Sequence, residues 1–168
     1  MQSLSITRCR LEAQGFLGLD DATLTELGPW MRWSPAVCAL VMATGTILAS
    51  PAVLWTLAVI AALGAALPFH PFDLMYNHLV RHLTRTRPLP HHAIQRRFAC
   101  GLAAVWLLAT GLAFREGAMA LGYALGASLT AVAGIVGVTH FCIPSLVFNT
   151  LVRRRTAASA YAARGARS

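Results

Sequence analysis

Apolar residues form four long stretches along the chain, at approximately residues 33–49, 52–69, 98–114 and 118–141. None of the four contains a charged residue between its ends. At 1.5 Å per helical residue, each stretch is long enough, or nearly so, to cross a hydrocarbon core about 30 Å thick. The pattern therefore predicts an all-α membrane protein with four transmembrane helices.

Very short links join these stretches in pairs. Residues 49–51 connect the first two stretches, and residues 115–117 connect the last two. Links of this length require two antiparallel helical hairpins. Small residues recur in all four stretches, and Gly122 and Gly126 form one G-x-x-x-G spacing. This spacing lets helices approach closely, either inside the bundle or between two copies of the chain.

Two further helices are expected where the second and fourth stretches end. Pro71 fits the first turn of a new helix. Its apolar face is formed by Phe72, Tyr76, Leu79 and Leu83, and a second face carries Asp73, Asn77, Arg81 and Arg85. This pattern predicts a short amphipathic helix on the membrane surface. Pro144 similarly interrupts the fourth stretch, and residues 145–155 continue beyond it as a second surface helix.

The same pattern divides the chain into three parts. Residues 1–29 form an N-terminal segment, residues 30–155 form the transmembrane domain, and residues 156–168 form a flexible tail. The transmembrane domain splits into halves of two stretches each, at about residues 30–90 and 91–155.

An internal repeat relates the two places where a stretch meets its surface helix. Residues 69–81 align with residues 141–153, and six of the thirteen positions are identical. The identical pairs are Phe69/Phe141, Leu74/Leu146, Asn77/Asn149, Leu79/Leu151, Val80/Val152 and Arg81/Arg153. Because each half contains two crossings, the halves are expected to be parallel repeats about a pseudo-twofold axis along the membrane normal.

The repeat brings chemically different residues into equivalent positions. His70 corresponds to Cys142, and Asp73 corresponds to Ser145. The predicted cluster at the ends of the second and fourth spans comprises His70, Asp73, Asn77, His140, Cys142, Ser145 and Asn149. Within it, His70, Asp73 and Cys142 are of the donor types that bind zinc or iron.

A structural interpretation of the same residues stays open. Asp73 is favoured at a helix start by the helix dipole alone, and Cys142 is small enough to act as an apolar filler. Cys38 and Cys100 lie within apolar stretches and are predicted to be packing residues.

The charges predict the orientation of the chain. All 14 basic residues are arginine, the formal net charge is +8, and most arginines lie in residues 70–97 and in the C-terminal tail. The positive-inside rule therefore places the middle loop and both termini in the cytoplasm. The basic residues expected to face anionic lipid headgroups are Arg81, Arg85, Arg153, Arg154 and Arg155. Because the arginines sit at helix ends, no nucleic-acid partner is predicted.

The sequence contains no catalytic template. Four of its six acidic residues precede Gly28, and the other two, Asp73 and Glu116, are predicted on opposite membrane faces. This distribution argues against a paired-carboxylate hydrolase. With no catalytic template in the sequence, a non-enzyme is favoured over an enzyme. The favoured function is a non-enzymatic accessory or scaffold module that binds itself or another membrane protein. The alternative is a small redox or metal-handling protein that uses the His/Asp/Cys cluster. No particular cofactor is indicated.

Two short motifs give the chain a family resemblance. Arg96-Arg97-Phe98-Ala99 enters the third stretch, and Thr139-His140-Phe141-Cys142 ends the fourth. With these motifs, residues 10–152 resemble the DUF4395 family of small bacterial membrane proteins of unknown function. The resemblance implies a multi-pass protein of the bacterial cytoplasmic (inner) membrane and supplies no reaction. Many family members carry Cys-x-x-Cys at the final position, whereas this chain has Cys142-Ile143-Pro144-Ser145 and lacks the second thiol of that pair.

Overall fold

The computed structural model describes residues 2–91 and 93–152, and all the regular structure within them is helical. The all-α class expected from the sequence is therefore confirmed. The elements are α1 (Gln2–Ala13), α2 (Asp21–Leu27), the 3-10 turn η1 (Trp30–Arg32), α3 (Trp33–Ile47), α4 (Pro51–Ala66), α5 (Pro71–Met75), the π-helical turn η2 (Tyr76–Val80), α6 (Arg81–Thr84), α7 (Ile94–Arg115), α8 (Met119–Thr139) and a C-terminal helix, Ile143–Val152.

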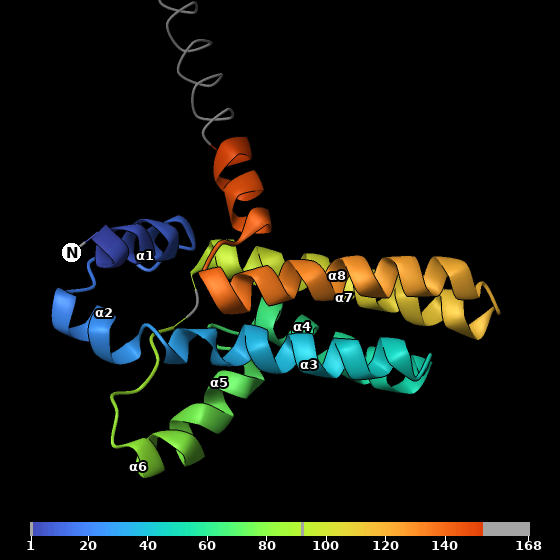
Figure 1. Ribbon diagram of the computed structural model, residues 1–168, viewed down its shortest axis with the longest axis horizontal. Helices are drawn as coiled ribbons and strands as arrows, with labels where there is room; N and C mark the ends of the chain where they lie inside the picture. Colours follow the sequence, from blue (N-terminus) through green and yellow to red (C-terminus); the bar gives the residue numbers. More distant parts are fainter. Residues whose placement is uncertain (1, 92, 153–168) are drawn as a thin grey trace, which may run out of the picture.

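The four long helices form one bundle from two hairpins. Within the bundle α4 packs along α7, and α3 packs along α8. Both hairpin turns lie at one end of the bundle, and the short helices gather at the other end (Figure 1). Leu54 and Leu57 of α4 meet Leu107 of α7 and Leu129 of α8 in the apolar core.

The two hairpin turns have the same backbone geometry. After α3, the Ser50 N–H donates to the carbonyl of Gly45 and the Ala49 N–H donates to that of Thr46. After α7, equivalent bonds are made by the N–H groups of Ala118 and Gly117. This pair of bonds defines a Schellman motif, whose C′ residue adopts positive φ. Ala49 at φ 46° and Gly117 at φ 75° occupy that position.

The glycines of the G-x-x-x-G spacing both face neighbours inside the chain. A Cβ atom added at Gly122 would lie 2.5 Å from the Phe114 ring, and one added at Gly126 would lie 2.4 Å from Thr46 Oγ1. Of the two alternatives for this spacing, the structure therefore uses it for packing within the bundle.

Both hairpins end in a sharp break. Helix α4 stops at Ala66, and the segment Pro71–Thr84 continues at 84° to it. Helix α8 stops at His140, whose φ of 58° ends the helix, and the C-terminal helix begins at Ile143. The two outgoing helices leave the bundle in different directions from the same end (Figure 1).

By length and composition, two helices can cross a membrane on their own, namely α7 with 22 residues and α8 with 21. Helix α4 and the segment Pro71–Thr84 qualify only as one bent pair, which raises the number of candidate spans to three. The four predicted crossings are therefore not confirmed, since α3 has only 15 residues and α4 only 16. The apolar pattern continues past both helices, but their ends are set by the turns described above.

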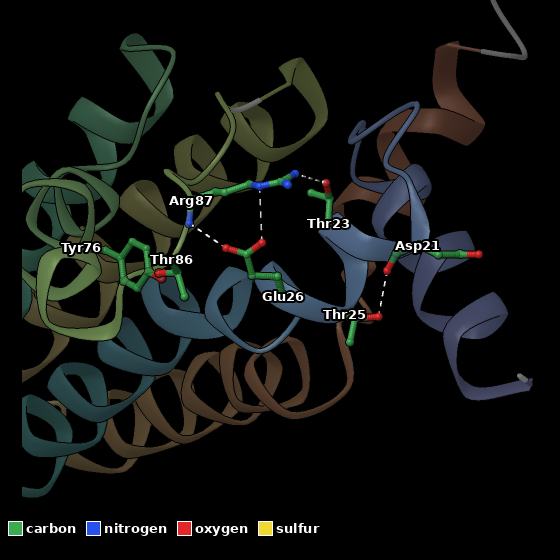
Figure 2. A network of polar contacts seen from close by, with 7 residues as sticks. All are labelled: Asp21, Thr23, Thr25, Glu26, Tyr76, Thr86 and Arg87. Carbon is green, nitrogen blue, oxygen red and sulfur yellow. Dashed lines mark hydrogen bonds and ion pairs between the residues drawn. The ribbon is translucent and has the colours of Figure 1, made fainter.

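The N-terminal segment packs against the end of the bundle. Leu11 of α1 and Leu24 of α2 share a second apolar core with Tyr76. Helix α2 is also bound to the loop after α6 (Figure 2). The Glu26 carboxylate accepts a 2.9 Å hydrogen bond from the Arg87 backbone N–H and forms a 3.4 Å ion pair with the Arg87 guanidinium.

Candidate functional site

A cavity of about 150 Å³ lies between the four long helices, near the end of the bundle where α4 and α8 stop. Its walls are mainly apolar and include Met42 of α3, Leu57 of α4, Leu107 of α7 and Leu129 of α8. A largely apolar cavity with a few polar groups is the usual form of a small-molecule site.

Three of the four cysteines line this cavity, one from each of three segments. Cys38 lies on α3, Cys100 lies on α7, and Cys142 lies between α8 and the C-terminal helix. All three carry free thiols. Cys38 and Cys100 were predicted to be packing residues; Cys38 packs against the apolar core, and both also line the cavity.

His70 reaches the cavity from the break after α4. Its Nδ1 atom accepts a 3.3 Å hydrogen bond from the Phe72 backbone N–H and so caps α5. In the neutral imidazole this leaves the proton on Nε2. The Nε2 atom lies 3.9 Å from the Cys38 sulfur, so its N–H can donate to that sulfur.

The predicted cluster is brought together only in part. His70 and Cys142 are buried and line the same cavity. Ser145 is buried beside Cys142 and donates a 3.1 Å hydrogen bond to its sulfur. Asp73 is also buried, but it lines an adjoining crevice together with Arg96.

The other predicted residues bind the segments around the cavity. His140 Nε2 accepts a 2.8 Å hydrogen bond from Arg32 Nε. Asn77 Oδ1 accepts from the backbone N–H of Leu89 at 2.8 Å. Asn149 Nδ2 donates to the carbonyl of Ala13 at 2.8 Å. These three side chains therefore act as links between elements.

Within the described residues, no three His, Cys, Asp or Glu side chains form a group that could hold a metal ion. The predicted ligands His70, Asp73 and Cys142 do not form such a group; His70 and Cys142 line the cavity, whereas Asp73 lines the adjoining crevice. Of the predicted lipid-facing arginines, Arg85 is exposed and Arg81 is partly buried. Arg153, Arg154 and Arg155, like the tail 156–168, lie outside the described residues.

Two hydrogen-bond donors of the cavity were missed by the sequence analysis. Arg96 is buried, with Nη2 3.4 Å from the carbonyl oxygen of Met31 and the guanidinium 5.5 Å from the Phe16 ring centre. The Nε1–H of Trp106 is buried and has no hydrogen-bond partner in the part of the chain that the structure describes. A tryptophan in the middle of a span, away from the membrane interface where it is enriched, was the available signal.

The end of the N-terminal helix α1 is bonded to the end of α8 beside the cavity. Gln14 is buried, lines the cavity and donates a 2.6 Å hydrogen bond to the carbonyl of His140. Arg10 donates to the carbonyl of Thr139 at 2.7 Å. Together these bonds satisfy carbonyl groups left open where α8 ends.

The environment of His140 keeps its imidazole neutral. Burial lowers the pKa of His140 to about 4, and the positive charges of Arg32, Arg96 and Arg10 act in the same direction. The neutral state agrees with the Arg32 hydrogen bond, because Nε2 can accept only when it carries no proton.

Comparison with known proteins gives one match. The family model described as "Domain of unknown function (DUF4395)" matches residues 29–153. No curated protein and no solved structure matches the chain. The match begins after α2, so α1, α2 and the cavity-lining residue Gln14 lie outside it.

Proposed function

We propose a function from the premise that this chain belongs to the DUF4395 family, whose members share a domain of unknown function. We infer that it is a non-enzymatic membrane module that binds a small, mainly apolar molecule in the cavity between its four long helices. One observation carries this proposal: apolar side chains from all four helices line a cavity of about 150 Å³ that contains only a few polar side chains. A dry apolar cavity of comparable volume is known to accept a molecule of the size of benzene.

The proposal treats all four long helices as membrane crossings. Helix α4 alone is about 24 Å long at 1.5 Å per residue, and η1 extends α3 to a continuous helical segment, Trp30–Ile47. Local thinning of the bilayer accommodates spans of this length at modest cost. The arginine distribution supports cytoplasmic termini and a cytoplasmic middle loop.

Reporter fusions in a bacterial host test this topology. A fusion after Arg87 should report a cytoplasmic position, and a fusion at Gly117 should report the opposite side. A periplasmic signal from the Arg87 fusion would contradict the proposed orientation, and a cytoplasmic signal at Gly117 would contradict the second hairpin.

We also propose that the halves are parallel repeats. Three features support this: the hairpin turns share the Schellman geometry, the outgoing helices begin at Pro71 and Ile143 with the same 72-residue offset, and α4 packs on α7 as α3 packs on α8. A structure determined in lipid tests the repeat by superposition of the halves. Displacement of Asn77 from Asn149 by a helical turn would contradict the alignment.

Ligand binding can be tested with a cavity-filling variant. Toluene should raise the thermal stability of the protein in lipid nanodiscs, and the Ala103→Phe substitution should abolish this rise because Ala103 lines the cavity. The matched control is Ala109→Phe, which adds the same ring to an exposed position of the same helix. Toluene partitions into the lipid equally in all samples. An equal rise in all three proteins would therefore contradict binding in the cavity.

A second candidate function is thiol redox chemistry in the same cavity, favoured by its three cysteines and by the contact between His70 and Cys38. Two thiols would form one disulfide and pass two electrons and two protons to a quinone-type carrier from the membrane. Alkylation followed by intact mass analysis tests this after incubation with a short-chain quinone. The candidate is supported if two thiols can no longer be alkylated, and if this loss does not occur when Cys38 is replaced by serine. An unchanged number of alkylated thiols rejects it. Cys9→Ser is the control because Cys9 is exposed and is not among the residues that line the cavity.

A further inference from the structure

We propose that the cavity is specific for a small organic anion with an apolar body and a hydrogen-bond acceptor at its far end, such as a substituted aromatic carboxylate. This inference rests on the proposed binding function and names the chemical class of its ligand. It rests on two features of the cavity wall. Hydrogen-bond donors line it, and no Asp or Glu occurs among the described residues of the wall.

The polar groups on the wall are mainly donors. Gln14, His70, Arg96 and Trp106 line the cavity and carry N–H groups. Gln14 already donates to the His140 carbonyl and His70 contacts the Cys38 sulfur, so Arg96 and Trp106 are the donors left for a ligand. No Asp or Glu occurs among the described residues that line the cavity. A cationic ligand would therefore find no carboxylate partner there, whereas a ligand with acceptor oxygens would be complementary.

Arg96 supplies the charge that selects an anion. Its guanidinium stays protonated in proteins and has five N–H donors. Its one hydrogen bond to a described residue is the 3.4 Å contact with the carbonyl of Met31, which is long for an N–H···O bond. Arg96 lines the cavity and also the adjoining crevice, where Asp73 lies. A carboxylate can accept two parallel bonds from one guanidinium, which makes it the best partner for the part of Arg96 that faces the cavity.

Trp106 marks the opposite end of the ligand. It follows Arg96 by ten residues on α7, so the two Cα atoms are separated by about 15 Å along the helix axis. Both residues line the cavity. Because the indole N–H is only a donor and is buried without an acceptor among the described residues, a ligand oxygen would satisfy it. A ligand with two separated acceptor groups fits this arrangement.

Three probes of nearly equal size separate these features. 4-Methoxybenzoate has the carboxylate and a distal ether oxygen, 4-ethylbenzoate lacks the ether oxygen, and 4-methoxybenzyl alcohol lacks the charge. We expect 4-methoxybenzoate to bind at least about tenfold more tightly than the alcohol, because a charge-assisted pair with Arg96 is stronger than a neutral one. We expect it to bind about fivefold more tightly than 4-ethylbenzoate, because of the Trp106 hydrogen bond.

Two variants assign these preferences to residues when dissociation constants are measured in nanodiscs. Trp106→Phe keeps the ring and removes the N–H, so it should equalise the two benzoates. Trp55→Phe is the matched control, since the Trp55 N–H donates to the Leu108 carbonyl outside the cavity. Arg96→Gln should abolish the preference for the anion. If Arg96→Gln does not fold, the comparison of benzoate with alcohol in the unchanged protein still tests the charge.

The outcomes separate this inference from the proposed function. Equal binding of the benzoate and the alcohol, both blocked by Ala103→Phe, overturns the anion specificity and leaves the binding function intact. A preference for the methoxy group that persists in Trp106→Phe overturns the role of Trp106. Failure of toluene and of all three probes to bind overturns both proposals.

Discussion

Arg32 donates a 2.8 Å hydrogen bond from Nε to Nε2 of His140 and thereby joins the start of α3 to the end of α8. Arg97 makes the corresponding contact in the other direction, from the start of α7 to the carbonyl of Ala65 at the end of α4. In both cases an arginine at the start of the first helix of one hairpin binds the end of the second helix of the other hairpin. These contacts close the end of the bundle that contains the cavity.

The first prediction concerns the pH dependence of stability. The pKa of His140 is about 4 in the folded protein and about 6.5 in an unfolded chain. Between these values the unfolded chain binds a proton that the folded protein does not, so stability falls as the pH is lowered from 6.5 toward 4. The full loss is about 3 kcal/mol, from the difference of the two pKa values.

Thermal unfolding in detergent at pH 7.5 and pH 4.5 measures this loss. His140→Asn should reduce the difference between the two pH values, and asparagine tolerates the positive φ of this position. His91→Asn removes an exposed histidine and should leave the difference unchanged. The assignment to His140 is wrong if the two variants behave alike.

The second prediction concerns the cap of α4. Arg97 donates to the carbonyl oxygens of Ala65 at 2.8 Å and Ala66 at 2.7 Å. These carbonyls belong to the last turn of α4, where the helix itself supplies no N–H donor for them. Arg97→Gln should destabilise the protein by about 1–3 kcal/mol, as expected when a charged hydrogen-bond donor is removed. Arg115→Gln is the control, because Arg115 is exposed and its guanidinium lies over the Trp55 ring. Equal unfolding temperatures for the two variants would reject the capping role.

The third prediction uses two glycines of one helix. A methyl group at Gly126 would lie 2.4 Å from Thr46 Oγ1, so α3 and α8 would have to separate. At Gly134 nothing lies within 4 Å of the added carbon. Gly126→Ala should therefore lower the unfolding temperature, whereas Gly134→Ala should maintain or raise it through its higher helix propensity. The reverse order would show that the helices do not pack through Gly126.

The fourth prediction concerns the two hairpin turns. Ala49 holds a φ of 46°, and Gly117 holds a φ of 75° in the equivalent position. Because a side chain disfavours positive φ by about 1 kcal/mol, Ala49→Gly should stabilise the protein and Gly117→Ala should destabilise it. Reversible unfolding in mixed micelles measures both changes. A loss of stability in Ala49→Gly would show that the flexibility it adds to the unfolded chain outweighs the relief of strain.

The sequence located the helices well because a run of apolar residues is a local signal. The stretches at residues 98–114 and 118–141 correspond to α7 (Ile94–Arg115) and α8 (Met119–Thr139). The ends of α3 and α4 were missed because they depend on turn geometry and caps. Helix α4, for example, ends where Arg97 reaches it from 31 residues away. The hydropathy pattern around residue 66 does not reveal such a distant hydrogen-bond donor.

The cavity was predicted less completely than the helices. The repeat drew attention to His70 and Cys142, which occupy breaks that prolines mark in the sequence. It could not identify Cys38 or Trp106, since each looks like an ordinary member of an apolar helix until the facing helix is known. In the sequence, Arg96 looks like one of the arginines of the middle loop. Its burial depends on contacts with Phe16 and Met31, which lie far away in the chain.

The last prediction tests the surface position of the segment Pro71–Thr84. This segment leaves α4 at 84°, and its Leu79 and Leu83 side chains are 63% and 82% exposed in the isolated chain. If α4 runs along the membrane normal, the segment lies close to the membrane plane, where leucines enter the lipid and the exposed Arg85 meets anionic headgroups. A spin label at Leu83→Cys, in a Cys9→Ser background, should then be accessible to oxygen dissolved in the lipid and shielded from a water-soluble nickel complex. A label at His91→Cys, an exposed loop position, should show the opposite accessibility. Equal access of the nickel complex to both labels would place the segment in water and reject its role as a membrane-surface helix.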